Sequence, residues 1–121
     1  SGGQRQKVLI AAALAQEASV LLLDEPATYL DYRHQAEVIA LIERLHRDSG
    51  YTVITVSHDL NQGALESDRV LALSGGRVVL DGRPEDLARP EVLNDVFQTP
   101  FDVFVHARSG RTLVVPLRNR P

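Results

Sequence analysis

The pattern of apolar and polar positions in the first half of the chain predicts a helix, a strand, a second helix and a second strand. Residues from about Gly3 to Glu17 are rich in alanine and lack proline, which favours a buried helix, apolar on most sides. The apolar run Val20–Leu23 stops at acidic residues, as a strand covered on both faces would. Apolar residues at helical spacing lie between Asp31 and Gly50, and the β-branched run Thr52–Val56 predicts another buried strand. This order predicts two parallel strands joined by a right-handed crossover.

The second half of the chain has shorter elements separated by turn residues. A short helix is expected at 59–66 and a strand at 69–73. Two more short helices should begin at Pro84 and Pro90, and a terminal hairpin should be formed by 101–107 and 112–117. Ser74-Gly75-Gly76-Arg77 stands between two apolar runs and predicts a hairpin turn. The whole chain therefore predicts one α/β unit with an antiparallel C-terminal part.

Composition and charge restrict the class of protein without assigning a function. Hydrophobic residues make up 44% of the 121 residues and charged residues 24%, as in ordinary globular proteins. The longest apolar stretch, Val8–Ala15, is far shorter than the roughly 20 residues that cross a bilayer. The absence of cysteine excludes disulfides and thiolate metal sites and favours a cytoplasmic setting. A net charge of −3 predicts no basic face for nucleic acid.

The first four residues, Ser1-Gly2-Gly3-Gln4, allow two interpretations. A serine followed three residues later by glutamine is the pattern of a capping box at a helix start. Two glycines in a first helical turn cost helix propensity, which is reasonable where something approaches the backbone closely. Amides exposed at a helix N-terminus, aided by the helix dipole, can hold a phosphate group. The motif therefore predicts either a helix cap or a phosphate site.

Two acids and a histidine follow the two predicted parallel strands. Asp24 and Glu25 come directly after the first strand, and His58 comes shortly after the second. Ligand chemistry in open parallel sheets gathers at the carboxyl ends of strands, so His58 is expected beside the two acids. One acid could bind in a Mg²⁺ shell while the other orients a water, and His58 could hydrogen-bond a terminal phosphate. The simpler alternatives are solvated acids and a structural or exposed histidine.

The remaining candidates for chemistry have no such context. His34, His46 and His106 are expected on the surface, and Asp59 is expected to cap a helix rather than to bind a ligand.

The order of these motifs resembles that of the ABC ATPases. The chain contains SGGQ, a helix, an apolar run ending in Asp-Glu-Pro, an aspartate-containing loop, and Ser-His-Asp after the next strand. The resemblance covers the whole chain. It implies an α/β fold with a parallel sheet, similar to the P-loop (RecA-like) NTPases, followed by C-terminal β-hairpins.

The resemblance also implies a role for each candidate residue. Ser1-Gly2-Gly3-Gln4 match the family signature, which contacts nucleotide, without its usual leading leucine. Asp24 matches the aspartate that acts on Mg²⁺ through water, and Glu25 matches the catalytic carboxylate that polarises the attacking water. Asp31 resembles the loop aspartate that links two nucleotide sites, and His58 matches the catalytic switch histidine. ATP and Mg²⁺ are the implied cofactors.

Finer features are similar to importers of ferric siderophores, ferric citrate and cobalamin. These features are the runs Thr28-Tyr29-Leu30-Asp31, Arg33-His34-Gln35, Ser57-His58-Asp59-Leu60-Asn61-Gln62 and Gly82-Arg83-Pro84-Glu85, with Val96-Phe97 and Ser109-Gly110-Arg111 near the end. They imply ATP hydrolysis that powers import of an iron–siderophore or related metal chelate.

The phosphate-binding run G-x-x-x-x-G-K-[ST] of this family does not occur in the chain. The resemblance therefore implies a C-terminal part of the subunit, which is expected not to turn over ATP alone because phosphoryl transfer needs that phosphate cradle. Within it, residues 1–17 would hold the signature motif and helix, 18–81 the catalytic part and 82–121 a C-terminal extension.

The missing upstream part would also leave a gap in the sheet. By the same resemblance, the strand that leads into the phosphate loop lies between the strands at 52–56 and 69–73. We expect a vacant slot there, flanked by unpaired backbone and by apolar side chains such as Val53, Ile54 and Val70.

The implied partners are a second ATPase subunit in a head-to-tail homodimer, transmembrane permease subunits and, indirectly, a substrate-binding protein, but no nucleic acid. The implied location is peripheral, on the cytoplasmic face of the cell (inner) membrane. Two alternatives stay open: an ABC ATPase that does not transport, and a non-catalytic interaction module. The first is expected to carry coiled-coil insertions or tandem cassettes, which the chain lacks. The presence of Asp24, Glu25 and His58 argues against the second.

Overall fold

The chain folds as two units, Ser1–His58 and the residues from Asp59 onward, in the computed structural model, which describes residues 1–118. Each unit has its own hydrophobic core. The first unit comprises α1 (Gly2–Leu14), β1 (Val20–Asp24), α2 (Tyr32–Arg47) and β2 (Thr52–Val56). The boundary between the units falls inside the predicted catalytic part 18–81. The three-part division of the chain follows motifs rather than compactness and stays a prediction.

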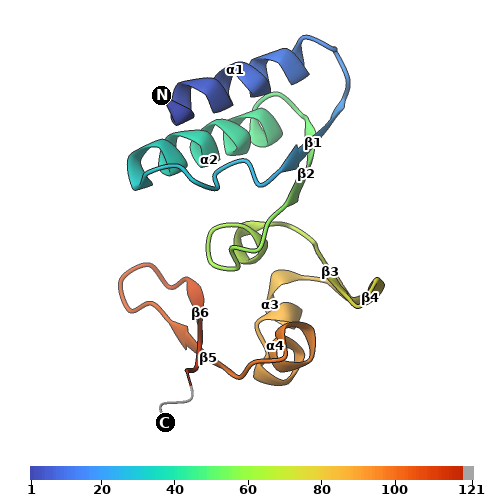
Figure 1. Ribbon diagram of the computed structural model, residues 1–121, viewed down its shortest axis with the longest axis vertical. Coiled ribbons are helices and arrows are strands. Elements are labelled where there is room, and N and C mark those ends of the chain that lie inside the picture. The colour runs from blue at the N-terminus through green and yellow to red at the C-terminus, as the bar shows by residue number, and fades with distance from the viewer. Residues whose placement is uncertain (119–121) are drawn as a thin grey trace. The chain divides into compact units, whose positions relative to one another are not determined.

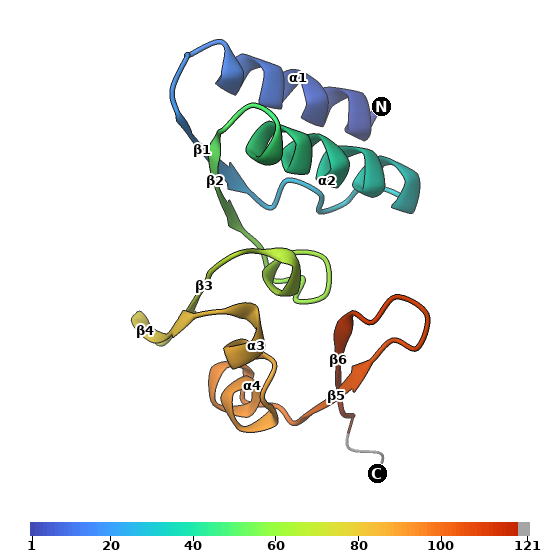
Figure 2. The ribbon, with the colours of Figure 1, turned by 180° about the vertical axis from the view of Figure 1, so that it is seen from behind.

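In the first unit, β1 and β2 form a parallel pair, with α2 as the connection between them. Figures 1 and 2 show α1 and α2 running side by side. The core of this unit joins Ile10 of α1, Leu23 of β1 and Val38 of α2. The predicted order of strand, helix and strand and the parallel pairing are therefore confirmed.

The strands and α1 are less buried than the sequence predicts. On β1, Leu21 and Leu23 are buried, whereas Leu22 on the opposite face is 73% exposed. Val8 on α1 is 67% exposed, and no residue of β2 is fully buried. The predictions of a helix buried on most sides and of strands covered on both faces are wrong for this chain. The physical reason is that the helices of the unit cover only one face of its two-stranded sheet.

The strand edge predicted to be vacant is present on β2, but two of the three side chains named beside it are covered. Among the described strands, β2 pairs only with β1, so its other edge has no strand partner. Ile54 is exposed as expected. Val53 lies opposite Leu21 in the register, shares its covered face and packs against the first core. Val70 belongs to the second core and is also buried, so the prediction is wrong for these two valines.

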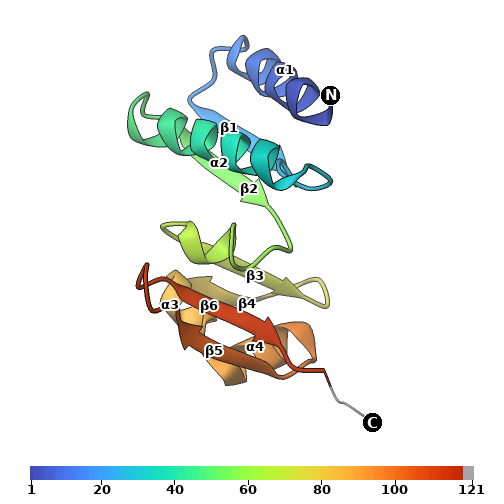
Figure 3. The ribbon, with the colours of Figure 1, turned by 90° about the vertical axis from the view of Figure 1, so that its left-hand side faces the viewer.

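The second unit is built from short elements (Figure 3). They are η1 (Ala64–Glu66), β3 (Val70–Ser74), β4 (Arg77–Gly82), α3 (Pro84–Leu87), α4 (Pro90–Phe97), β5 (Phe101–Val105) and β6 (Thr112–Pro116). β3 pairs with β4 and β5 with β6, both antiparallel, as predicted. Gly75 and Gly76 make the first hairpin turn with φ of +57° and +74°, values that favour glycine.

The helix predicted over 59–66 is shorter than expected, because only Ala64–Glu66 are helical and these form a 3₁₀ turn. Asp59 Oδ1 accepts a hydrogen bond from Gln62 N at 3.1 Å, which closes a turn in place of the first helical turn. Asp59 therefore has a capping role at this turn, in line with its predicted one. The core of the unit is formed by residues from β3, α3, α4 and β6, namely Val70, Ala72, Leu87, Leu93 and Val114.

Candidate functional site

The parallel register places the candidate acids and the histidine at one edge of the β1–β2 pair. Asp24, the last residue of β1, lies opposite Val56, the last residue of β2. Glu25 and His58 then follow the two strands, and Glu25 N donates to Val56 O at 2.8 Å. The sequence prediction that His58 lies beside the acids is confirmed in its geometry.

Glu25 is fixed by hydrogen bonds on both carboxylate oxygens. Thr28 Oγ1 donates to Glu25 Oε2 at 2.6 Å, and His58 Nδ1 lies 2.7 Å from Glu25 Oε1. Glu25 also has a φ of +47°, a left-handed value that is uncommon for any residue with a side chain. This backbone conformation turns the chain sharply after β1, and strained backbones of this kind cluster at functional sites.

The two bonds also govern the ionisation of Glu25. The Thr28 hydroxyl and, second, the His58 imidazole lower the pKa of the Glu25 carboxyl, since both hydrogen bonds favour the carboxylate. Glu25 is therefore ionised at neutral pH and can accept a proton or hold a water through an oxygen lone pair. The His58 side chain is 76% exposed and that of Glu25 is 31% exposed, so a ligand in solvent can reach the pair.

Asp24 is exposed at the end of β1, and no hydrogen bond or ion pair from residues 1–118 engages its carboxylate. Within that same range, no group of three or more His, Cys, Asp or Glu side chains could hold a metal ion. Mg²⁺ does not require such a cage, because it usually keeps several waters and binds one or two carboxylates together with substrate phosphates. The chemistry of Asp24 fits that mode of binding.

The signature residues form the start of α1. Ser1 Oγ accepts a hydrogen bond from Gln4 N at 3.3 Å, and Gln4 Oε1 accepts one from the Ser1 amino group at 3.5 Å. The capping box predicted as one alternative is therefore present. No hydrogen bond in the described part of the chain connects these residues with Glu25 or His58. The second alternative, a phosphate site, stays a prediction.

Gly3 is buried against α2 in a way that leaves no space for a side chain. A Cβ atom at Gly3 would collide with the imidazole of His34. His34 in turn bonds Asp31, whose Oδ1 accepts from the His34 backbone N at 2.9 Å and lies 2.8 Å from the ring Nδ1. These bonds, the backbone one first, lower the pKa of the Asp31 carboxyl. Asp31 is the N-cap of α2 in this structure.

Two residues of this region were not predicted from the sequence. His34 was expected on the surface, but its side chain is only 26% exposed and connects Gly3 with Asp31. Thr28 was considered only as part of a family run, although it holds Glu25. Its position three residues after Glu25, in a loop that begins with proline, is the one signal that could have suggested the contact. His46 and His106 are exposed, as predicted.

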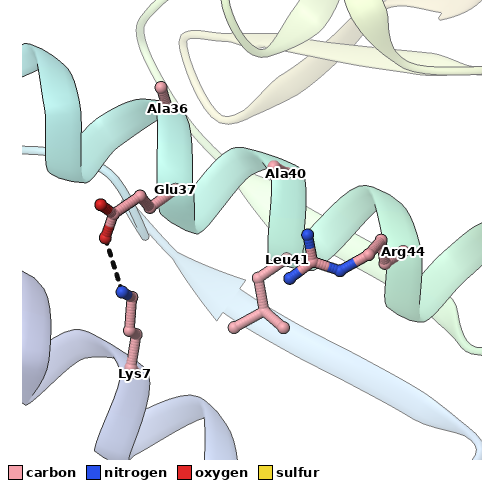
Figure 4. Close-up of a pocket in the computed structure, with 6 residues that line it drawn as sticks. All are labelled: Lys7, Ala36, Glu37, Ala40, Leu41 and Arg44. Carbon is pink, nitrogen blue, oxygen red and sulfur yellow. Dashed lines mark hydrogen bonds and ion pairs between the residues drawn. The ribbon is translucent and has the colours of Figure 1, made fainter.

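An open groove of about 510 Å³ lies along α2 (Figure 4). It is lined by Lys7, Ala36, Glu37, Ala40, Leu41 and Arg44. Lys7 Nζ and Glu37 Oε2 form an ion pair across it at 2.6 Å. None of the candidate catalytic or metal-binding residues lines this groove, so the candidate site is the exposed strand edge at Glu25 and His58.

None of the helices within residues 1–118 has the length and apolar character needed to span a membrane.

Comparison with known proteins adds independent findings. The family model described as "ABC transporter" matches residues 1–28. The chain is 44% identical over 111 residues to the Iron(3+)-hydroxamate import ATP-binding protein FhuC of Bacillus subtilis, covering 92% of this chain and 41% of that protein. The chain thus spans about two fifths of the length of the curated relatives it matches.

Solved structures agree with these relatives. One, described as a metal-chelate type ABC transporter in an inward-facing conformation, matches with a TM-score of 0.87 and 33% identity over 98% of this chain and 47% of that chain. Another, a dimeric ATP-binding cassette in a post-hydrolysis state bound to ADP and Pi, matches with a TM-score of 0.61 and 36% identity. This second match covers 69% of this chain and 36% of that chain. The predicted P-loop NTPase-like α/β fold is confirmed, and the chain belongs to the ATP-binding proteins of ABC transporters.

Proposed function

We propose that the chain is the part of an ABC ATPase that runs from the signature motif onward, and that the intact protein hydrolyses ATP to power import of a metal chelate. The intact protein here means this chain continued to the length of its relatives. The observation that carries the proposal is the contact between Glu25 and His58, 2.7 Å apart at the ends of two neighbouring parallel strands. This edge is where open α/β sheets hold their ligands.

In this proposal Glu25 is the catalytic carboxylate. Its lowered pKa keeps it charged, so it can orient a water and accept a hydrogen bond from that water as the water attacks the terminal phosphate. Thr28 fixes one oxygen of the carboxylate and thereby leaves the other for His58 or a water. His58, largely exposed, donates to the terminal phosphate and exchanges that contact with the one to Glu25.

Asp24 would hold Mg²⁺ through water, together with phosphate oxygens, and the ion would supply positive charge beside the phosphates. Ser1, Gly2, Gly3 and Gln4 would contact nucleotide bound mainly by a second subunit, and Asp31 would connect the two sites. The start of α1 supports this role for the signature, because its first amides are aligned by the capping box and backed by the helix dipole.

Transport is favoured over the non-transport alternative by the comparisons. The relative FhuC is named for import of iron(3+)-hydroxamate, and the matching structure for a metal-chelate type transporter. We therefore propose a homodimer of the intact protein that works with membrane permease subunits, on the cytoplasmic side, and with a substrate-binding protein. An iron chelate is the proposed class of cargo.

The substitution Glu25→Gln in the intact protein tests the catalytic assignment. It keeps the shape of the side chain but removes the charge that orients the water, so ATP hydrolysis should fall by about 100-fold or more. ATP binding should be preserved, and the nucleotide-bound dimer should persist, as measured by phosphate release, nucleotide affinity and gel filtration.

Glu43→Gln is the matched control, since Glu43 is an exposed glutamate of α2 that lies outside the candidate site and the signature. Its hydrolysis rate should match that of the unaltered protein. Turnover near the normal rate in the Glu25→Gln protein would remove Glu25 from the catalytic role.

A further inference from the structure

The first turn of α1 contacts the first turn of α2 through His34, and both helices belong to the first unit. The three heavy atoms nearest to the place of a Cβ atom at Gly3 all belong to the His34 side chain, whose own Cβ is 2.8 Å from that place. Of residues 1–5, only Gly3 is buried. Figures 1 and 2 show that the two helices begin side by side and run in the same direction. The imidazole thus packs directly on the backbone of the signature.

The position of this imidazole is set by Asp31. His34 Nδ1 lies 2.8 Å from Asp31 Oδ1 and 2.9 Å from Oδ2, and the His34 backbone N donates to the same Oδ1 at 2.9 Å. An ionised carboxylate can only accept hydrogen bonds, so Nδ1 carries a proton and donates it to the bond. The side chain and the backbone of His34 are therefore both held by one carboxylate, which leaves the ring little freedom to turn.

The same face of α1 meets α2 again in the following turns. Lys7 Nζ pairs with Glu37 Oε2 at 2.6 Å, and Ile10 and Val38 share the first core. These contacts lie one and two turns beyond Gly3, so they hold the middle of α1 rather than its start. The start of α1 is held to α2 by the His34 ring.

We propose that His34 is a positioning residue that fixes the signature, residues 1–4, relative to Asp31. The inference rests on the proposed function, in which the signature contacts nucleotide bound by a second subunit and Asp31 connects the two sites. Both groups then act across the same interface between subunits, so the spacing between them decides whether both reach their partners at once. His34 sets this spacing because it touches Gly3 and bonds Asp31.

The test measures ATP hydrolysis by the intact protein, at a temperature below the unfolding midpoint of every variant. His34→Ala removes both the contact with Gly3 and the side-chain bond to Asp31. It should lower kcat by about tenfold, because small displacements of groups that act together are costly. KM for ATP should stay within about twofold of normal, since the phosphate cradle, and not the signature, holds most of the nucleotide.

Two further variants separate positioning from packing. In His34→Asn the amide nitrogen takes the place of Nδ1 and still donates to Asp31, and the amide oxygen takes the place of Cδ2 beside Gly3. His34→Leu has a similar shape but no donor. The asparagine variant should keep kcat within about threefold of normal, whereas the leucine variant should be nearly as slow as His34→Ala. Equal rates in the asparagine and leucine variants overturn the proposal, and this comparison stands even if His34→Ala does not fold.

His46→Ala is the matched control, because His46 is an exposed histidine in the last turn of the same helix. It should leave both kcat and KM unchanged.

Gly2→Glu tests the proposed contact of the signature with nucleotide separately. The nearest atom to a Cβ at Gly2 is a flexible Leu30 methyl at 3.3 Å, and an acid is favourable at a helix start, so the fold should accept the change. The new charge repels a phosphate and should lower the rate. If Gly2→Glu lowers the rate and His34→Ala does not, the inference alone fails. If Gly2→Glu keeps the full rate, the proposed nucleotide contact fails and takes the inference with it.

Discussion

At the scale of single residues, Thr28 helps to keep Glu25 ionised by lowering the pKa of its carboxyl. Its hydroxyl is the largest cause of the lowered pKa of Glu25, at an oxygen distance of 2.6 Å. Thr28→Val keeps the shape of the side chain and removes the donor, so the pKa of Glu25 should rise toward its ordinary value. A pH titration of the Glu25 carboxyl carbon by NMR measures this in the intact protein.

The direction of this pKa shift determines how the stability of the fold depends on pH. A carboxyl whose pKa is lowered on folding stabilises the folded state above its unfolded pKa, and this contribution is lost as pH falls through the folded pKa. In the Thr28→Val protein this contribution should therefore be smaller, and its loss should be complete at a higher pH than in the unaltered protein. Thr52→Val, on β2 and away from Glu25, should leave the titration unchanged; an unshifted Glu25 titration in Thr28→Val would contradict the assignment.

Gly3 provides a second prediction at this scale. Alanine normally favours a helix over glycine, but here its Cβ would collide with the His34 ring. Gly3→Ala should therefore destabilise the protein by about 1–3 kcal/mol in thermal or urea unfolding. Gly2→Ala is the matched control, because the nearest atom to a Cβ there is a flexible Leu30 methyl at 3.3 Å.

The double substitution Gly3→Ala with His34→Ala should cost less than the sum of the single changes, because removing the ring removes the collision. Strictly additive effects would show that the ring is not the obstacle.

The part of the candidate site that lies at the strand ends was predictable from the sequence. Asp24, Glu25 and His58 were found because parallel strands end at one edge, and the register brings them there. Thr28 and His34 were not found, because their contacts depend on the path of the loop after Glu25, including its left-handed φ. A hydrophobic pattern does not specify such a path.

At the scale of elements, the start of α2 depends on Asp31. Its carboxylate accepts the His34 backbone N–H, which would otherwise lack an intrahelical partner. Asp31→Ala should lower the midpoint of thermal unfolding by roughly 2–4 °C, whereas Asp31→Asn, which keeps the cap, should have a smaller effect.

The difference between Asp31→Ala and the unaltered protein should shrink in acid. The pKa of Asp31 is lowered on folding, so its stabilising effect is present at neutral pH and is lost as pH falls through the folded pKa. Unfolding midpoints measured at neutral and at strongly acidic pH check this. A difference that does not depend on pH would exclude the charged cap as its source.

The elements themselves were largely predictable, but their burial was not. Period, turn residues and proline positions located both hairpins, α3, α4 and the β1–α2–β2 crossover. The prediction of burial was wrong at Leu22 and Val8. An apolar pattern shows that a face is suited to burial, but it does not show that the same chain supplies the residues that cover it. The relatives are more than twice as long as this chain.

At the scale of the whole molecule, the 121-residue chain on its own should neither hydrolyse ATP nor stay a monomer. It lacks the phosphate-binding run, and the face of β1–β2 away from the helices exposes Val20, Leu22, Ile54 and Val56. The free edge of β2 can pair with other chains.

Phosphate release and light scattering test these two expectations separately. Steady phosphate release that is lost in Glu25→Gln would show the first to be wrong. A monodisperse monomer with a sharp thermal transition would count against the second.

In the second unit, Asn61 Nδ2 donates to the backbone O of Val114 on β6 at 2.9 Å. This bond joins positions 53 residues apart, and it therefore sets an order on biosynthesis. Asn61 leaves the ribosome long before β6 is synthesised. By then β1, α2 and β2 are complete, and the hairpin β3–β4 follows soon after. Nascent chains fold unit by unit from the N-terminus. The segment after His58 thus emerges untethered and is secured only when Val114 has been added. Completion of the last strand is in this sense the final assembly step for the segment at Asn61, and a chain released before β6 is made lacks this bond.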